Sequence, residues 1–534
     1  MKINKFTSLF ATCLLMGLTA CSNENVSDAD SSNSAENKDL TGKTSFSITS
    51  EAKTRTSGVY DGSGVDFYWT TDDNIWVNSG SATSPTLTAS SSNNITSTTA
   101  SAKFYFDGIY TAASYPVRYT GKASTSGNTV TIATSQNQDE ANNATQLGTV
   151  GDCGVGTATR QTDGSYKFAL NHEASYITFM PYYSKEELAA SAVVTQINVT
   201  VANGESLAGT FNFSDNGLGT AISSSSNSVT LTLNGTSSTT GFPIPTAATA
   251  SKNAAIMVVA PGTYSTFKVT YTLYDSVTGT ESTISYTYRN INCTPGKNQK
   301  ISTDLGMATY TSRKSNYYMW DAKKNYWDGY ESSQPLLNNA ANTNYAKSSA
   351  DSRWYNTAFT KNVQTKAINS CKDQPTFEAL TWYIDGGSPQ LDKTTLWVFA
   401  NHLYVGGIWI KKQSRIFNFS SAMNYQSTSR WIEGKDIPVS VNISGKPKAS
   451  VRSDYFYLPA LGKYTDGKLT GLGVSGYYWA STPNPVNNGD RSKPYGKVIS
   501  ANCLRFTIDE SDIDNVYVRS YYERYVGMQV QKFE

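Results

Sequence analysis

The sequence predicts a mainly β protein in which antiparallel β-sandwiches precede a C-terminal domain of mixed α and β structure. Composition is the first reason: the chain contains 35 tyrosines and 39 glycines, and tyrosine suits a half-buried pleated surface. The second reason is a series of short segments in which polar and apolar residues alternate between turn-forming residues. Tryptophan becomes more frequent after about residue 310, which separates a C-terminal part from the rest.

The first strand is expected at residues 45–49, where Phe46 and Ile48 alternate with polar residues. Residues 70–74 suit a turn because they contain Asp and Asn. One helix is expected, at residues 185–190. Further strands are expected at residues 66–69, 75–77, 103–110, 129–133, 166–170, 176–180, 197–201, 229–233, 255–259, 267–273 and 282–288. Short strands with polar turns are typical of antiparallel sandwiches.

The C-terminal part is expected to contain one helix at residues 375–385. Phe377, Leu380 and Ile384 would lie on one face of this helix, and two glycines at 386 and 387 would end it. Strands are expected at residues 402–405, 408–411, 476–482, 503–506, 516–519 and 527–530. The combination predicts an α+β domain.

The N-terminus indicates export. Lys2 and Lys5 precede an apolar stretch, residues 6–20, that is too short to span a bilayer and is typical of a signal peptide. The stretch ends in Leu-Thr-Ala-Cys, which resembles the lipobox of bacterial lipoproteins, where the cysteine is acylated. We therefore expect an acylated, palmitate-type anchor on Cys21 and a place at the outer membrane surface. The alternative is an ordinary secretory signal that happens to end in cysteine.

Residues 22–43 form an expected tether. They are rich in Ser, Asn, Asp and Glu and contain almost no large apolar side chain before Leu40. Such a composition does not bury enough surface to become ordered by itself. A disordered leash between a lipid and a folded body suits display at a surface.

Charge and histidine content exclude several classes of function. The 44 basic and 42 acidic residues nearly cancel, and there is no long basic run, which argues against a nucleic-acid partner. His172 and His402 are the two histidines, and they are far apart in the sequence, which argues against a His-based metal site or catalytic triad. We expect no cofactor and no metal, and we expect His172 to be a packed structural residue.

Residues 44–306 resemble the fimbrillins, the subunits of surface fimbriae in certain Gram-negative anaerobes. The resemblance lies in the order of six landmarks: the first strand with Thr54-Arg55-Thr56, Trp69 with residues 72–77, residues 110–116, Gln136, residues 171–179 and residues 294–301. It implies two tandem transthyretin-like Greek-key sandwiches, at residues 44–181 and 182–308.

The resemblance also implies an assembly mechanism. In fimbrillins, an Arg-specific protease removes the first strand of the surface lipoprotein, and Arg55 is the matching position here. Loss of Phe46 and Ile48 would expose an apolar groove along a sheet edge, which a strand from the next subunit would fill. The alternative is that Arg55 is simply an exposed loop residue.

The C-terminal part, residues 309–534, resembles C-type-lectin-like and formylglycine-generating-enzyme-like modules. The carrying residues are 457–460, 476–482, 504–506, Arg524, Gly527 and Val530. The region lacks the Glu-Pro-Asn, Gln-Pro-Asp and Trp-Asn-Asp motifs of calcium-dependent lectins, and it lacks a paired-cysteine copper site. Most tryptophans here are expected in the core, and Trp431, in a charged loop-like stretch, is the candidate for ligand contact.

Four cysteines remain after the signal and the anchor: Cys153, Cys293, Cys371 and Cys503. An exported protein permits disulfides. We favour Cys153–Cys293 and Cys371–Cys503, because each pair then stays within one part of the chain. Four buried free thiols are an equally open alternative.

These observations predict a structural and adhesive protein rather than an enzyme. The expected role is a minor or tip fimbrial subunit that joins other subunits by strand exchange, while its C-terminal domain adheres to a host or bacterial glycan or protein. The alternative is a surface-anchored glycan-binding lipoprotein or an accessory protein of glycan hydrolysis. Asp321 and Asp328 are an acidic pair, but their spacing does not mark an acid and a nucleophile.

Overall fold

The computed structural model describes residues 40–48, 57–62, 64–235, 240–358, 366–425, 437–439, 445–483, 500–508 and 516–534. Lys43–Glu534 forms one compact unit, and Met1–Gly42 is divided from it. Cys21, Arg55 and Trp431 lie outside the described residues, as do the expected signal peptide and almost all of the expected tether. Within the described ranges, no helix is long and apolar enough to cross a membrane.

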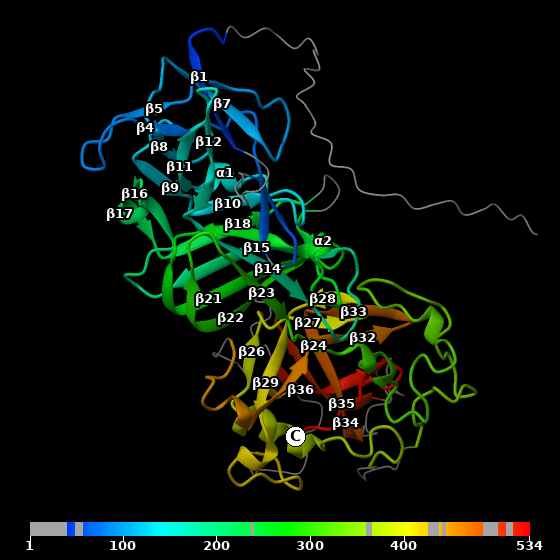
Figure 1. Ribbon diagram of the computed structural model, residues 1–534. Coiled ribbons are helices and arrows are strands. Elements are labelled where there is room, and N and C mark those ends of the chain that lie inside the picture. Colours follow the sequence, from blue (N-terminus) through cyan, green and yellow to red (C-terminus); the bar gives the residue numbers. More distant parts are fainter. Residues whose placement is uncertain are drawn as a thin grey trace, which may run out of the picture. The chain divides into compact units, whose positions relative to one another are not determined.

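The first lobe is built on a sheet of nine described strands (Figure 1). The path of this sheet is β5 (Leu87–Ala89), β4 (Trp76–Asn78), β8 (Ser114–Tyr119), β11 (Gly154–Arg160), β12 (Tyr166–Phe168), β1 (Lys43–Ile48), β7 (Ala102–Asp107) and β6 (Ser92–Asn93), with β13 (Leu170–His172) paired to β11. Burial alternates along β7, so one face of the sheet is polar. The other face covers an aromatic core around Trp69, Phe104 and Tyr119.

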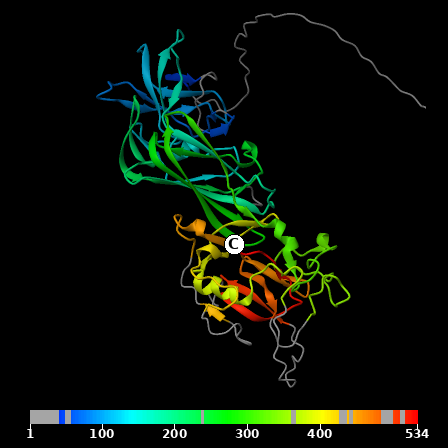
Figure 2. The same ribbon diagram turned by 90° about the horizontal axis from the view of Figure 1, so that it is seen from below.

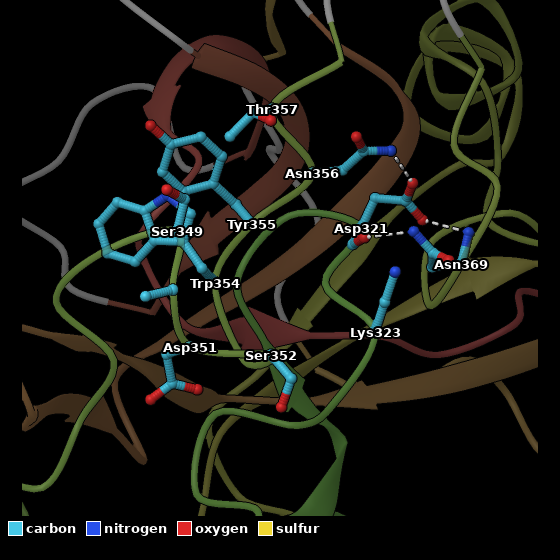
Figure 3. Close-up of a pocket in the computed structure, with 11 residues that line it drawn as sticks. Asp321, Lys323, Ser349, Asp351, Ser352, Trp354, Tyr355, Asn356, Thr357 and Asn369 are labelled. Atoms are coloured by element: carbon cyan, nitrogen blue, oxygen red, sulfur yellow. Dashed lines mark hydrogen bonds between the residues drawn. The ribbon is translucent and has the colours of Figure 1, made fainter.

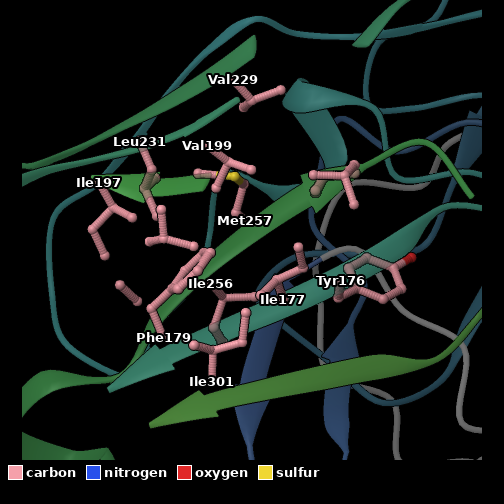
Figure 4. Packing of buried hydrophobic residues seen from close by; sticks show 14 of the residues in the cluster. Tyr176, Ile177, Phe179, Ile197, Val199, Val229, Leu231, Ile256, Met257 and Ile301 are labelled. Atoms are coloured by element: carbon pink, nitrogen blue, oxygen red, sulfur yellow. The ribbon is translucent and has the colours of Figure 1, made fainter. Parts of the chain in front are cut away.

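The second lobe is a sandwich of two sheets. One sheet has the order β10 (Ser135–Gln138), β18 (Ser228–Leu233), β15 (Ala192–Val201), β21 (Gly262–Asp275) and β22 (Thr280–Cys293), with β19 (Phe242–Pro243) beside β15. The other has the order β20 (Ala255–Val259), β14 (Ser175–Tyr182) and β23 (Asn298–Asp304). Figure 4 shows Ile177 and Phe179 from β14 beside residues of the first sheet such as Ile197 and Leu231 in one apolar core.

Smaller elements complete the lobes. A third sheet joins β9 (Thr129–Ile132) to the hairpin of β16 (Ala208–Ser214) and β17 (Gly217–Ser226). β2 (Ser57–Tyr60) pairs with β3 (Val65–Tyr68), and Gly58 of β2 also forms an isolated bridge with Ala144. Two single-turn helices are α1 (Leu147–Val150) and α2 (Ala250–Asn253).

The cores divide the chain differently from the boundary expected at residues 181 and 182. β14 ends at Tyr182, yet both of its partners, β20 and β23, belong to the second lobe. β9 and β10 also pair with strands of the second lobe. The strands before β14 therefore serve two cores, because hydrogen bonding to distant partners determines membership and sequence order does not.

The C-terminal domain contains three groups of strands, drawn from green to red in Figures 1 and 2. The largest sheet has the order β25 (Tyr317–Tyr318), β37 (Met528–Gln529), β34 (Ser475–Pro483), β35 (Ser500–Thr507), β36 (Val516–Glu523) and β30 (Ile437–Val439), with the hairpin of β32 (Leu461–Thr465) and β33 (Lys468–Leu472) attached to β34. The other groups are β26 (Gln390–Asp392), β29 (Gly407–Lys411) and β31 (Tyr455–Pro459), and β24 (Ala308–Thr309), β27 (Trp397–Phe399) and β28 (His402–Tyr404). The mainly β fold is confirmed.

The helix expected in this domain is present. α3 (Phe377–Thr381) continues as a π-helical turn, Trp382–Gly386, and the side chain of Thr376 caps it by accepting a hydrogen bond from Ala379 N at 3.1 Å. A side chain at Gly387 would meet the carbonyl oxygen of Tyr383, so only glycine fits where the turn ends. Short 3-10 turns occur at Thr311–Asn316, Glu331–Ser333, Gln413–Arg415 and Arg452–Asp454.

The helix expected at residues 185–190 is wrong, because this segment makes tertiary contacts instead of a helical turn. Lys185 Nζ donates to the carbonyl oxygen of Met307 at 2.6 Å. Glu186 Oε1 accepts hydrogen bonds from the hydroxyls of Thr309 and Thr311 at 2.9 and 2.8 Å. These contacts use the side chains that a surface helix would leave in solvent.

Candidate functional site

The first strand occupies an internal position in its sheet. All six residues of β1 pair with β7 in the antiparallel sense, and Phe46, Ser47 and Ile48 pair with β12 in the parallel sense. Removing β1 would therefore open a slot between two strands. The expectation of a sheet edge is wrong, because β1 has a paired strand on each side. Both of these neighbours come from later in the chain.

Phe46 is the main anchor of this strand. Its side chain is completely buried, and its ring stacks on Tyr166 at 4.6 Å with an interplanar angle of 8°. The edges of Phe106 and Tyr110 approach the same ring at 4.9 and 5.5 Å. Ile48 is 2% exposed. Burying two such side chains contributes about 1.5–3 kcal/mol each.

Three other side chains of β1 make polar contacts with the neighbouring chain. Thr44 Oγ1 donates to the carbonyl oxygen of Gly108 at 2.8 Å, and Ser47 Oγ donates to that of Tyr166 at 3.2 Å. Lys43 forms an ion pair with Asp107 at 3.0 Å at the surface. Only one face of β1 is apolar, and its two buried side chains are two residues apart.

The predicted cleavage position follows β1 directly in the sequence. β1 ends at Ile48 and β2 begins at Ser57, and Arg55 lies between them, outside the described residues. β2 belongs to a separate hairpin with β3 and does not pair with β1. A cut at Arg55 would therefore divide β1 from the body without removing a residue of β2.

Both histidines are bound to buried aspartates. His172 Nδ1 lies 2.7 Å from Asp152 Oδ1, and its ring stacks on Phe67 at 4.0 Å. Tyr176 donates its hydroxyl proton to the same Asp152 oxygen. Burial, followed by the nearby Asp152 carboxylate, raises the pKa of Tyr176 well above its ordinary value. This packing agrees with the structural role expected for His172.

His402 joins the second lobe to the C-terminal domain. Its Nδ1 lies 3.0 Å from Asp275 Oδ2, and Leu403 N donates to that oxygen at 3.0 Å. Ser191 Oγ lies 3.4 Å from the same Nδ1. A nucleophilic triad needs the serine and the aspartate on opposite ring nitrogens, so this arrangement is not a triad. Sequence reasoning did not predict this contact, because His402 and Asp275 are far apart in the sequence.

Cys153, Cys293, Cys371 and Cys503 are all buried. Cys153 and Cys293 share one apolar core, and Cys371 and Cys503 share another, as the favoured pairs require, but neither pair is bonded. The two favoured disulfides and the alternative of four buried thiols both stay predictions. Burial raises the pKa of the Cys293 and Cys371 thiols to about 12, which makes them poor nucleophiles.

Asp321 organises a loop and is not an exposed acid. Its side chain is completely buried, and its oxygens accept hydrogen bonds from Asn356 Nδ2 at 2.7 Å and from the backbone N–H groups of Ile368, Asn369 and Cys371 at 2.9, 2.7 and 3.2 Å. Asp328, the other member of the acidic pair, forms an ion pair with Lys324 at 2.7 Å. The two carboxylates have separate structural partners.

A pocket of about 330 Å³ lies beside Asp321 in the C-terminal domain (Figure 3). Trp354 and Tyr355 stand side by side at one side of the view, with ring centroids 4.7 Å apart, and Lys323 and Asn369 stand at the other. Ser349, Asp351, Ser352 and Thr357 also line it. Sequence reasoning missed this pocket because its lining comes from an irregular segment with no recognisable motif.

The tryptophans of the C-terminal domain divide as expected in most cases. Trp397 and Trp479 are completely buried, and Trp382 is 8% exposed. Trp409 is half-buried and donates its indole N–H to Asp392 Oδ2 at 2.9 Å. Trp431 lies outside the described residues, and Trp354 is the half-buried tryptophan that lines the pocket.

Comparisons with known proteins give weak structural similarities. No family model matches the sequence, and no curated protein matches it. A candidate cell adhesion protein from Bacteroides uniformis is 12% identical, with a TM-score of 0.29, and the match covers 49% of this chain and 93% of that chain. A fimbrial protein from Bacteroides ovatus is 11% identical, with a TM-score of 0.23, and the match covers 53% of each chain. At this level of similarity, function has to be argued from the geometry of the chain itself.

Proposed function

We propose that this chain is a subunit of a cell-surface fimbria. In this proposal, the chain reaches the outer membrane surface as a lipoprotein acylated on Cys21, and a protease then cuts at Arg55. β1 leaves, and a strand from a neighbouring subunit takes its place between β7 and β12. The one observation that carries the proposal is the position of β1, which is hydrogen-bonded on both sides and buries only Phe46 and Ile48.

The slot defines the strand that would fill it. The incoming strand must run antiparallel to β7 and parallel to β12, as β1 does. It needs an aromatic residue opposite Tyr166 and a branched apolar residue two positions later, with polar residues between and before them. Backbone hydrogen bonds to two neighbours supply affinity, and the two apolar side chains supply register.

Phe533 and Glu534 are packed into the C-terminal domain. Phe533 is 7% exposed and contacts Tyr383 and Phe456 with ring centroids 5.2 and 5.5 Å apart. Gln413 N donates to the carbonyl oxygen of Glu534 at 2.8 Å. Residues 528–534 would have to leave the core of the C-terminal domain before they could enter another subunit. The chain is therefore suited to accept a strand rather than to donate this segment.

An exchange experiment tests the proposal. The chain is cut with an Arg-specific protease and mixed with a fluorescent peptide of residues 43–50, and binding is followed by anisotropy. We expect the peptide to enter cleaved chain and not uncleaved chain. A peptide carrying Phe46→Ser should bind at least about tenfold more weakly, because it loses most of the buried aromatic surface.

Two matched controls sharpen this experiment. A Ser47→Ala peptide keeps both anchors and should bind like the unchanged peptide. An Arg55→Lys chain keeps the charge but removes the Arg-specific cleavage site between β1 and β2, so it should not take up peptide. Equal binding of the Phe46→Ser and Ser47→Ala peptides, or uptake by uncleaved chain, would contradict the proposal.

The proposed role of the C-terminal domain is adhesion rather than catalysis. Asp321 and His402, two groups that could otherwise suggest acid–base chemistry, are engaged in hydrogen bonds that hold the fold. The pocket beside Trp354 offers a recognition surface on this domain. This second observation favours a ligand-binding role for the domain.

A further inference from the structure

The pocket beside Trp354 is held by buried charged groups. Arg524 is 1% exposed, and its guanidinium donates to the carbonyl oxygens of Asn356 and Ala358 at 2.9 and 3.2 Å. Asn356 in turn donates its side-chain amide to Asp321. Arg353 is 5% exposed and binds both oxygens of Asp351, and its guanidinium lies 4.6 Å from the centroid of the Tyr330 ring. Trp354 and Tyr355 are therefore presented between two anchored residues.

The chemistry of the lining restricts the class of ligand. Hydroxyl, amide and charged groups make up most of the wall, and the two aromatic rings supply the main apolar surface. A lipid or another purely apolar ligand would leave these polar groups without water or partners. A polyhydroxylated ring has an apolar face that can lie on an aromatic side chain and hydroxyls that can bond to the rim.

Among the described residues that line the pocket, one positively charged side chain has no negatively charged partner. Asp351 is paired with Arg353, and the buried Asp321 carboxylate lies near the buried guanidinium of Arg524. Lys323 is exposed and lines the pocket, and among the described residues it has no ion-pair or hydrogen-bond partner. A ligand that carries a carboxylate would meet a charge-assisted donor here.

From these contacts we propose that the pocket binds an acidic pyranose, a six-membered sugar ring that carries a carboxylate. The face of the sugar lies on Trp354, its carboxylate accepts from Lys323 Nζ, and its hydroxyls bond to the rim formed by Ser352, Thr357 and Asn369. The volume of about 330 Å³ is at the small end of small-molecule sites and suits one or two sugar rings. This inference deepens the adhesive role proposed above and rests on it for its biological setting.

Trp354 also lines a second pocket, of about 220 Å³, together with Tyr345, Lys347 and Tyr525. The indole therefore divides two hollows of the same domain. A glycan longer than one ring would extend toward the second hollow. We accordingly expect an acidic disaccharide to bind more tightly than the monosaccharide.

Saturation-transfer NMR and calorimetry on the uncleaved chain, produced without its first 21 residues, test the proposal. The probes are the methyl glycoside of N-acetylneuraminic acid, glucuronate and neutral methyl glucoside. We expect binding of at least one acidic probe and at least about tenfold weaker binding of the neutral sugar, the usual effect of losing one hydrogen bond to a charged group. Uncleaved chain is used because this test then does not depend on strand replacement.

Adjacent lysines provide the matched variants. Lys323→Gln should weaken the acidic probe at least about tenfold. Lys324→Gln makes the same change of charge at a side chain that pairs with Asp328 outside the pocket, so it should leave binding unchanged. Trp354→Ala should abolish binding and Trp354→Phe should retain it, with circular dichroism to verify that both variants are folded.

Three outcomes would overturn the inference: no binding of either acidic probe, equal binding of neutral and acidic sugars, or equal losses for Lys323→Gln and Lys324→Gln. None of them bears on peptide exchange into the β1 slot. Conversely, failure of peptide exchange would leave sugar binding by the uncleaved chain intact. The two proposals can therefore fail separately.

Discussion

β1 of the first lobe and β14 of the second lobe have the same pairing but different burial. Each strand has one antiparallel and one parallel neighbour: β7 and β12 for β1, and β20 and β23 for β14. In β14, residues Ser175–Pro181 are all buried, whereas in β1 only Phe46 and Ile48 are buried. A strand buried on one face needs only an alternating pattern in its replacement, and a strand buried on both faces needs a specific fit at every residue.

Under the proposed strand exchange, this difference favours β1 over β14 as the strand that is replaced. β14 lies in the middle of its lobe's sequence and carries Ile177 and Phe179 into a core shared with β15, β18 and β20. β1 precedes every other described strand and is followed by the segment that contains Arg55. Both strands are central by their pairing, and burial and chain position favour β1 as the strand that the proposed exchange would replace.

The largest expected effect is a charge placed in β14. Ile177→Asp puts a carboxylate into an apolar core without a partner, and the cost of several kcal/mol should prevent the second lobe from folding. Phe46→Asp should disturb the first lobe while the second lobe and the C-terminal domain remain folded. Limited proteolysis with mass spectrometry distinguishes the two, and loss of all protected fragments in Phe46→Asp would break the comparison.

A smaller effect is expected from truncating the anchor of β1 in the intact chain. Phe46→Ala should lower the free energy of unfolding of the first lobe by about 3–5 kcal/mol, because it leaves a cavity against Tyr166 and Phe106. Denaturant titration measures the change. Ser47→Ala, on the polar face of the same strand, should change this free energy of unfolding by less than about 1 kcal/mol. Equal effects of the two substitutions would show that the apolar face of β1 does not contribute more to stability than its polar face.

The contact between Asp275 and His402 connects the second lobe to the C-terminal domain, and its stability can be compared with that of β1, the strand that the proposed exchange would replace. Burial alone would raise the pKa of Asp275, but hydrogen bonds from Leu403, Ser191, His402 and Val277 lower it from its ordinary value of 3.8. The carboxylate therefore stabilises the folded chain above pH 3.8, and this stability is lost as the pH falls through the lower folded-state pKa. Asp275→Asn should cost about 1–3 kcal/mol at pH 7.

Thermal unfolding of the Asp275→Asn variant from pH 7 down to pH 2.5 checks the sign of this effect. The difference from the unchanged chain should shrink as the solution becomes acidic. A difference in thermal stability that stays constant over the whole pH range would mean that the charge of the Asp275 carboxylate does not stabilise this contact.

The smallest effect is expected from reductant. Because the four described cysteines are buried and neither favoured pair is bonded, a reducing agent should leave the unfolding temperature unchanged, and labelling at pH 8 should require denaturation. Mass spectrometry of the alkylated protein counts the thiols. If either favoured disulfide forms in the exported protein, reductant should instead cost about 2–5 kcal/mol of stability.

Local alternation allowed most of the fold to be predicted. Residues 45–49, 229–233 and 476–482 were expected as strands, and the structure has Lys43–Ile48, Ser228–Leu233 and Ser475–Pro483. The helix near residue 377 was expected from its apolar face and its glycines, and it is present. The segment at residues 185–190 failed because its charged side chains bind Met307 and Thr309, more than a hundred residues away, and no local pattern records such partners.

The mainly β class, the place of most strands and the two side chains that β1 buries can be predicted from the amino-acid pattern, because the period of two in polar and apolar residues is a local property. The position of β1 between β7 and β12, the membership of β14 in the second core and the contact of His402 with Asp275 became known from the three-dimensional arrangement. This arrangement also brought Trp354 and Lys323 to one pocket. These features depend on which distant segments pair and pack, and hydrogen bonds and apolar contacts between distant segments leave no periodic signal along the chain.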